Sequence, residues 1–473
     1  MTQMMDRHNK VEKVSSNKYL QLKPDEASVL DLLRILFSGN LKSKEFIESL
    51  RVKETAFERR GYIFLSVSVQ KALRFISRPL FFCGSISEFC LNLLARNQSL
   101  PTLLLRILQG KVVMPEKESA SYLSAIGFID PRVDCHNKFK PWDKTYVVAL
   151  SAIASKIAYE NKAFIRATVE DQWKMELLGA YDFWNEYHQT KSTQGFMFHD
   201  KTSSPDRIIV AFRGTEPFNS DDWSTDFDIS WYKFHSIGKV HSGFMKAMGL
   251  QKDESWPANI PQDDQHPVAY YTIREKLRDY FEKNNKTKFV LTGHSLGGAL
   301  ALLFAAVLAF HNEAIILERL EAIYTFGQPR VGDGEFGDFM KEQFKNYGIE
   351  YYRFVYSHDI VTRLPYDNTS LHFKHFGTCL YYSSIYEGKI VSEEPDRNYF
   401  SLRSLISKRV DALWELVRSF LLPYLYGTEY RESLLLQALR LYGLLFPGMP
   451  AHGPPEYINA ICLGDATLFK APR

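Results

Sequence analysis

The stretch that decides the fold is Lys288-Phe289-Val290-Leu291-Thr292-Gly293-His294-Ser295-Leu296-Gly297-Gly298. Its apolar start is expected to be a strand, and Ala299–Phe310 after it is expected to be an apolar helix. A sharp strand-to-helix turn strains the backbone of its central residue, and small residues two positions to either side relieve the crowding. We therefore predict that Ser295 is a catalytic nucleophile in a turn formed with Gly293, His294 and Gly297. A glycine-rich turn packed against the core is the alternative.

A serine nucleophile needs a base, and the base needs an orienting carboxylate. In a strand–turn–helix context of this kind the order along the chain is serine, acid, histidine. Asp359 is the preferred acid, because it follows an expected strand, Tyr351–Tyr356, and so would lie at the same sheet edge as the serine.

Three histidines follow this acid: His372, His375 and His452. We favour His452 as the base because it lies in a loop rich in glycine and proline, where a side chain can be held outside regular structure. His375 and His372 remain alternatives, although both are close to the acid in sequence. His294, next to the nucleophile, is expected to have a packing role.

The oxyanion of an acyl-transfer intermediate needs backbone N–H groups. Leu296, directly after the nucleophile, would supply one. The expected strand Ile208–Phe212 runs into Arg213-Gly214-Thr215, so Thr215 would supply the second. The polar loop that follows carries two large aromatic residues, Phe218 and Trp223, and suits a lid over an apolar cleft.

Strands and helices alternate from Tyr146 onward, which predicts an α/β fold with a central, mostly parallel sheet flanked by helices. We divide the chain into a polar N-terminal region (1–55), an apolar lipid-associating segment (56–125) and an α/β domain (140–473) with a helical insertion at about 400–445. The uncharged run Phe289–Asn312 is long enough to span a membrane, but its glycines favour a buried strand and helix.

The composition argues against several classes of protein. Of 473 residues, 45% are hydrophobic and 24% are charged, as in globular proteins. The five cysteines include no CxxC pair, so we expect neither a zinc cluster nor a disulfide framework, and no metal or other cofactor. The net charge of +3 argues against a nucleic-acid partner. The N-terminus lacks the apolar core of a secretory signal, which favours a cytosol-facing protein.

Residues 61–111 combine apolar residues with six basic side chains and one acidic one, Glu88. Their longest uncharged run, Gly61–Gln70, is too short to span a bilayer, so the segment is expected to lie in a lipid interface. Lys71, Arg74 and Arg78 would share one helix face, and prolines at positions 79 and 101 are expected to break the segment. An amphipathic helix packed on the catalytic domain is the alternative.

Four motifs together resemble the class 3 lipases, which are α/β-hydrolases: Arg213–Thr215, Val240–Phe244, Gly293–Gly298 and Phe326–Gly332. The resemblance covers about residues 140–473. It implies Ser295 as nucleophile, Asp359 as acid, His452 as base, Thr215 with Leu296 as oxyanion hole, and a lid in the loop after Thr215.

Glu88–Leu94, Leu108–Val113 and His452–Ala460 are similar to plant oil-body lipases. This resemblance implies hydrolysis of triacylglycerol at lipid droplets and a location on the droplet and its associated cytosol-facing membrane, without secretion. A phospholipase, a galactolipid acyl hydrolase and a lipase-like signalling protein without hydrolysis remain alternatives. A homo-oligomer is also left open.

Overall fold

The computed structural model describes residues 18–37, 46–50, 57–185, 189–202, 204–250, 255–260, 263, 265–368, 371–399, 404–465 and 468. Parts of the expected N-terminal region (1–17, 38–45 and 51–55) and the start of the helical insertion (400–403) lie outside these residues. No helix within the described part of the chain combines the length and the apolar composition needed to cross a membrane.

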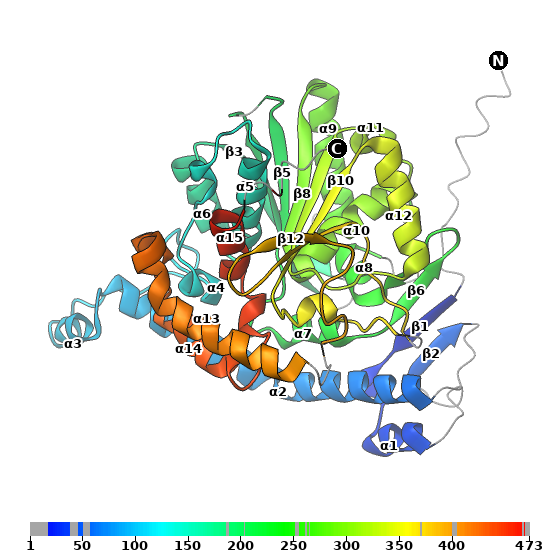
Figure 1. Ribbon diagram of the computed structural model, residues 1–473, viewed down its shortest axis with the longest axis horizontal. Helices are drawn as coiled ribbons and strands as arrows, with labels where there is room; N and C mark the ends of the chain where they lie inside the picture. The colour runs from blue at the N-terminus through cyan, green and yellow to red at the C-terminus, as the bar shows by residue number, and fades with distance from the viewer. Residues whose placement is uncertain are drawn as a thin grey trace.

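An eight-stranded sheet forms the centre of the molecule, with strand order β12-β11-β10-β9-β8-β5-β4-β3 (Figure 1). The five strands from β11 to β5 are parallel, and antiparallel strands extend both edges. The strands are β3 (Glu176–Asn185), β4 (Thr190–Asp200), β5 (Arg207–Phe212), β8 (Lys288–His294), β9 (Leu320–Phe326), β10 (Glu350–Tyr356), β11 (Thr378–Tyr382) and β12 (Gly388–Val391).

Helices cover both faces of this sheet, and each face has its own hydrophobic core. One face packs against α5 (Lys144–Ile157), α6 (Lys162–Arg166) and α15 (Pro454–Leu463). The other packs against α8 (Ser242–Met248), α9 (Ala269–Lys283), α10 (Leu296–Phe310), α11 (Ala314–Leu317) and α12 (Gly334–Tyr347). This three-layer arrangement confirms the predicted α/β-hydrolase fold. The uncharged run at Phe289–Asn312 forms the buried strand β8 and the buried helix α10.

The turn between β8 and α10 is packed backbone against backbone. A Cβ atom at Gly293 would lie 2.2 Å from the backbone of Gly297, and a Cβ at Gly297 would lie 2.2 Å from the carbonyl oxygen of Phe212 on β5. These distances leave no room for a side chain. The two glycines therefore allow α10 to begin directly against the ends of two parallel strands.

A smaller antiparallel sheet, in the order β2-β1-β6-β7, joins the N-terminal region to the rest of the fold. It consists of β1 (Lys18–Leu22), β2 (Ile47–Leu50), β6 (Trp231–Phe234) and β7 (Gly238–His241). Helix α1 (Val29–Phe37) lies between β1 and β2 in the chain. Because β1 pairs with β6, residues 18–22 are integrated with the hydrolase fold.

The apolar segment forms one long helix, α2 (Phe57–Arg96), followed by α3 (Leu100–Leu108). The prediction of a break at Pro79 is wrong: α2 continues through this exposed proline, and contacts with the rest of the protein hold the helix on both sides of it. The break expected at Pro101 is present, and Ser99 caps the helix that begins there.

The basic face predicted on α2 is only partly free. Lys71 Nζ donates to the carbonyl oxygen of Pro24 at 3.1 Å, and Arg74 pairs with Asp25. Two of the three basic side chains expected on this face are thus engaged by the N-terminal region. The remaining helices are α4 (Ala125–Ile129), α7 (Ser220–Phe227), α13 (Leu405–Tyr426) and α14 (Leu434–Gly443).

The packing of the turn predicts opposite effects for two glycine substitutions. Gly297→Ala forces a methyl group against the backbone of β5, and we expect it to lower the free energy of unfolding by about 2–3 kcal/mol. Gly61→Ala on α2 meets no atom within 4 Å. We expect it to raise stability by up to about 1 kcal/mol through helix propensity. Urea denaturation measures both, and equal effects would contradict the packing argument.

Candidate active site

Ser295 lies between β8 and α10 with φ at 58°, a left-handed conformation that is rare outside glycine. Its N–H donates to the carbonyl oxygen of Phe326 on β9 at 2.8 Å, which holds the strained turn against the sheet. The side chain is 2% exposed. The hydroxyl is therefore fixed in position and shielded from water.

Three predicted residues meet in one hydrogen-bonded chain. His452 Nε2 lies 2.8 Å from Ser295 Oγ, and His452 Nδ1 lies 2.8 Å from Asp359 Oδ2. Asp359 follows β10, and its Oδ1 accepts from the N–H of Val361 at 2.8 Å. The imidazole thus bridges the hydroxyl and the carboxylate, which is the geometry of a Ser-His-Asp triad.

The alternative histidines lie elsewhere. His375 Nε2 lies 2.7 Å from the carbonyl oxygen of Thr362 and 3.7 Å from Glu394, inside the protein. Burial holds the pKa of His375 well below its usual value, and Arg353 adds to this effect. His372 is exposed. Neither is placed by a described contact beside the serine.

Two residues that the sequence analysis did not single out lie against Asp359. The hydroxyl of Tyr457 on α15 donates to Asp359 Oδ2, the same oxygen that faces the imidazole. Gly327 has φ at 64°, and a Cβ there would lie 3.0 Å from both Asp359 Oδ2 and His452. Tyr457 and Gly327 both lie in quoted motifs, but spacing alone does not show what a side chain contacts.

His294 does more than pack. Its Nε2 lies 2.7 Å from the carbonyl oxygen of His452, and its Nδ1 lies 2.9 Å from the hydroxyl of Tyr159 on the segment after α5. Burial and the neighbouring His452 hold the pKa of His294 well below its usual value, so its ring is neutral. His294 therefore fixes the backbone from which the His452 side chain projects.

The predicted oxyanion residues flank the serine. Leu296 begins α10, and Thr215 follows β5, whose last residues pair with those of β8. Thr215 Oγ1 donates to Asp226 Oδ2 at 2.7 Å. Burial raises the pKa of Asp226 to about 7, against the opposing effect of this hydrogen bond. The bond ties Thr215 to α7, the helix of the expected lid.

The segment expected to be a lid is covered by α2. Trp223 Nε1 donates to the carbonyl oxygen of Pro217 at 3.1 Å within the segment. The hydroxyl of Ser66 on α2 donates to the carbonyl oxygen of Phe227 at 2.8 Å. Phe218 packs so closely on α2 that a Cβ at Gly84 would lie 2.4 Å from its Cβ. Helix α2 therefore lies directly on α7 and on the loop before it.

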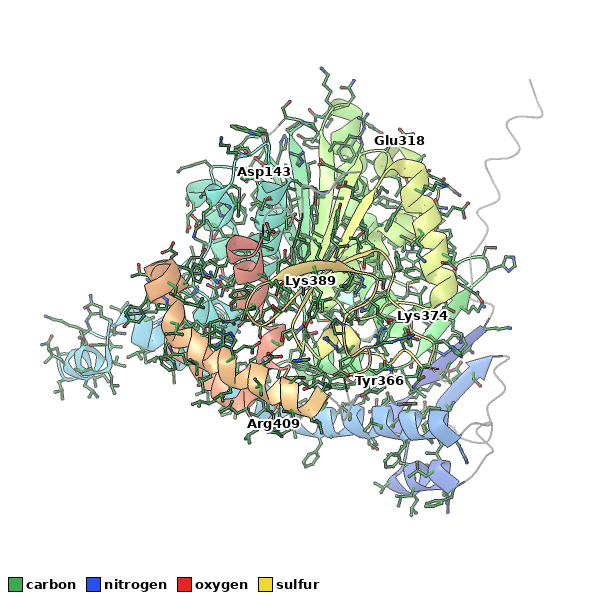
Figure 2. All side chains as sticks on the ribbon, in the orientation of Figure 1. Asp143, Glu318, Tyr366, Lys374, Lys389 and Arg409 are labelled. Atoms are coloured by element: carbon green, nitrogen blue, oxygen red, sulfur yellow. The ribbon has the colours of Figure 1, made fainter. Side chains whose placement is uncertain are left out.

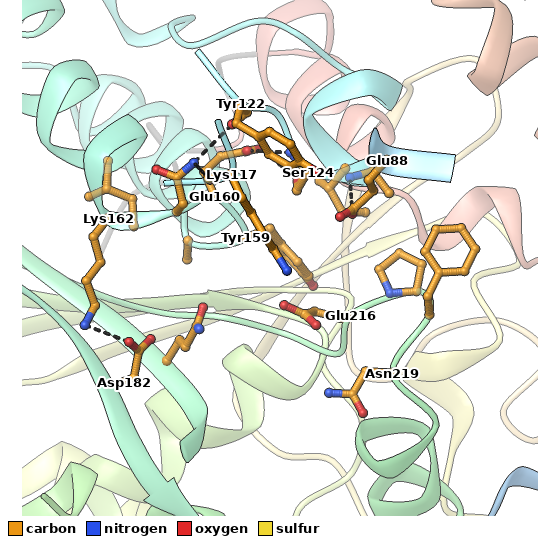
Figure 3. A pocket seen from close by; sticks show the side chains of 18 of the residues that line it. Glu88, Lys117, Tyr122, Ser124, Tyr159, Glu160, Lys162, Asp182, Glu216 and Asn219 are labelled. Atoms are coloured by element: carbon orange, nitrogen blue, oxygen red, sulfur yellow. Dashed lines mark hydrogen bonds and ion pairs between the residues drawn. The ribbon is translucent and has the colours of Figure 1, made fainter. Parts of the chain in front are cut away.

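A cavity of about 370 Å³ lies beside this loop (Figure 3). Its walls include Glu88, Tyr159, Glu160, Glu216 and the ion pair of Lys162 with Asp182 at 2.7 Å. Ser295 is not among its lining residues, and the charged lining does not suit an acyl chain.

Within the described residues no group of three or more His, Cys, Asp or Glu side chains is placed to hold a metal ion.

The sequence is similar to one described family and to individual proteins. Residues 209–369 match the family described as Lipase (class 3), a range that includes Thr215, Ser295 and Asp359. A Nicotiana tabacum protein named Triacylglycerol lipase OBL1 is 39% identical over 86% of this chain and 84% of its own. An Arabidopsis thaliana protein of the same name is 38% identical over 95% of each chain.

Among solved structures, a Rhizomucor miehei lipase in a propeptide complex aligns with 50% of this chain and 65% of its own, with 26% identity and a TM-score of 0.38. The two plant relatives match over most of their length as well as most of this chain. The chain therefore belongs to the class 3 lipases and is an ester-hydrolysing enzyme.

Proposed function

We propose that this enzyme hydrolyses the acyl esters of triacylglycerol at the surface of lipid droplets, with Ser295, His452 and Asp359 as its catalytic triad. The observation that carries the proposal is the chain of two 2.8 Å contacts that joins the hydroxyl, the imidazole and the carboxylate. In this proposal residues 140–473 carry the chemistry, and residues 56–125 contact the lipid.

The geometry supports a two-stage acyl transfer. Ser295 Oγ attacks the ester carbonyl carbon while His452 Nε2 takes its proton, and Asp359 stabilises the imidazolium that forms. The N–H groups of Leu296 and Thr215 receive the oxyanion of the tetrahedral intermediate. His452 then gives its proton to the departing alcohol. In the second stage His452 takes a proton from water, the water oxygen attacks the acyl carbon, and Ser295 Oγ leaves with the proton from His452 as the fatty acid is released.

The substrate class comes from the relatives, which are named triacylglycerol lipases. A phospholipase or galactolipid acyl hydrolase would use the same triad. Hydrolysis of triolein, phosphatidylcholine and galactolipid emulsions under matched conditions separates these substrates. We expect triolein to give the highest kcat/KM, and a preference for either polar lipid would contradict the assignment.

Ser295→Ala is expected to abolish ester hydrolysis and labelling by a fluorophosphonate probe, because the covalent route is lost. The turnover number should fall on the order of 10⁶-fold, and His452→Ala should give a similar loss. The double variant should be no worse than either single one, because the two residues act as a unit. Activity of Ser295→Ala above a few per cent would refute the mechanism.

His375→Ala is the matched control for His452→Ala. It removes a buried imidazole that contacts Thr362 and Glu394 and lies apart from the triad. We expect lower thermal stability, with turnover per folded molecule largely retained. An inactive His375→Ala beside an active His452→Ala would show that the base is assigned wrongly.

The loop from Glu216 and helix α7 form the lid in this proposal, with Phe218 and Trp223 as its aromatic residues. Ser295 is 2% exposed beneath it, so substrate entry requires this cover to move. Trp223→Ala should reduce hydrolysis of emulsified triolein about tenfold and hydrolysis of a short soluble ester by no more than about twofold. Equal losses on both substrates would assign Trp223 a structural role.

The exposed apolar side of α2 is proposed to enter the droplet surface. Phe75 is 87% exposed and Phe82, seven residues further along the same helix, is 65% exposed, and changing both to Asp should lower the droplet-bound fraction of the full chain about tenfold or more. The control is Trp142→Asp. Trp142 is 77% exposed in the connector before α5, and its replacement should leave the droplet-bound fraction unchanged. Fluorescence imaging of cells rich in droplets measures both. Full retention of the double variant would move the anchor elsewhere.

A further inference from the structure

Helix α13 presents an apolar stripe to the outside. Positions spaced by three and four residues place the stripe on one helix face. Tyr424 is 87% exposed and Ile406 78%. The outward residues are Ile406, Val410, Leu413, Val417, Phe420 and Tyr424. Every member of this stripe is aliphatic or aromatic.

The inward face of the same helix carries charges. Lys408, Glu415 and Arg418 are all buried. Lys408 Nζ lies 2.5 Å from Asp396, and Arg418 donates to the hydroxyl of Tyr356 and to Glu456 Oε2, each at 2.8 Å. Helix α13 is therefore held to the hydrolase largely by ion pairs and hydrogen bonds.

Helix α14 has the same inverted pattern. Leu434 is 84% exposed and Leu441 57%, and Leu445 directly after the helix is 66% exposed. Arg440 points inward, where its Nε donates to Glu432 Oε2 at 2.6 Å and its Nη2 donates to Glu456. Two neighbouring helices, α13 and α14, thus bury most of their charges and expose most of their apolar residues.

In water the hydrophobic effect favours the opposite arrangement. Burying an apolar side chain stabilises the folded state, whereas burying a charge destabilises it through loss of hydration. An inverted helix pair is stable when its outer face also leaves water. We propose that the outer face of α13 and α14 is a second lipid-docking surface, which inserts its stripe into the acyl region of an anionic phospholipid monolayer. This inference rests on the proposed action at lipid droplets.

The charges around the stripe fit an anionic surface. Within the described parts of α13 and α14, Glu415 is buried, and Asp411, whose side chain is 31% exposed, is paired with His358 at 2.8 Å, so neither helix presents an unpaired carboxylate. The connector between the two helices adds Glu429, which pairs with Lys138 at 3.3 Å. Arg409 is exposed on α13 (Figure 2), so the accessible charge on the helix itself is positive.

A chain of contacts joins α13 and α14 to α2, the helix of the proposed N-terminal lipid-associating segment. Glu88 on α2 accepts from the N–H of Ala125 at the start of α4, and α4 contacts α14, which contacts α13. In Figure 1 these helices lie at the end of the molecule opposite α9 and α11. In this proposal one lipid surface contacts both α2 and the outer face of α13 and α14.

The docking surface is also joined to the triad. Glu456 lies four residues after His452, and it binds Arg418 of α13 and Arg440 of α14. Lipid bound to α13 and α14 would therefore contact two helices that are joined by ion pairs to α15, the helix that follows the proposed catalytic base.

Phe420→Asp in the full chain tests the proposal, because Phe420 is 55% exposed on the stripe. The assay is flotation with triolein droplets coated with phosphatidylcholine and phosphatidylserine. We expect the partition coefficient to fall about tenfold or more. Hydrolysis of a soluble short ester should stay within about twofold of the unmodified chain, because Phe420 is outside the proposed triad and lid.

Three matched variants sharpen the result. Ile315→Asp places the same charge at a residue 64% exposed on α11, far from the stripe, and should float like the unmodified chain. Phe420→Trp should retain binding, because it keeps an aromatic group that suits the interface. If Phe420→Asp does not fold, Tyr424→Asp, at a residue 87% exposed, replaces it.

Unchanged flotation of Phe420→Asp would overturn the proposal, as would an unmodified chain that does not float. A lipid-free dimer that Phe420→Asp converts to a monomer, with flotation unchanged, would assign the stripe to a second copy of the chain. Flotation can be measured in a Ser295→Ala background, so the binding result does not depend on catalysis. If the unmodified chain binds the droplets but does not hydrolyse them, the proposed substrate is contradicted and the docking surface is still supported.

Discussion

The backbone of Ser295 is the constraint on which the rest of the structure depends. Its left-handed conformation exists because two glycines allow α10 to start against β5 and because the N–H of Ser295 is bound by Phe326 on β9. Three parallel strands and one helix thus fix one hydroxyl. Asp359 follows the next strand, β10, so the parallel sheet brings the proposed acid and nucleophile to the same edge.

The proposed base, His452, is separated from Asp359 by a longer part of the chain. Strands β11 and β12 and helices α13 and α14 lie between them, and among the described residues no strand leads directly to His452. Buried polar contacts do this instead: Tyr457 reaches Asp359, and Glu456 binds Arg418 and Arg440. Burial opposes ionisation of Glu456, but the two arginines hold its pKa below the ordinary value. Removing one partner of such a network leaves an uncompensated buried charge, so these contacts strongly favour one arrangement.

The sequence predicted the fold class, and local rules pointed to Ser295 and Asp359, whereas His452 was favoured by its order in the chain and by its loop rich in glycine and proline. A glycine pattern marks a turn, and an aspartate after an apolar strand marks a sheet edge. The small sheet was missed because β1 pairs with β6 across about two hundred residues, and short strands give little periodicity. The break predicted at Pro79 was wrong because helix breaking by proline is a local preference. Contacts on either side of the proline override it. The contacts of Tyr457 and Asp226 depend on the tertiary structure alone.

Helix α2 joins two parts of the proposed mechanism. One side of it packs on the lid segment, where Ser66 binds the carbonyl oxygen of Phe227 and Gly84 lets Phe218 approach the helix axis. The other side exposes phenylalanines to the outside. A ligand shifts a conformational equilibrium only as far as its affinities for the two states differ. Lipid binding to α2 therefore favours an open lid only when the open state gives α2 or α7 more apolar contact with the lipid than the closed state does. The half-buried Phe218 and Trp223 are the side chains that would provide that difference, because both lie in the segment proposed as the lid.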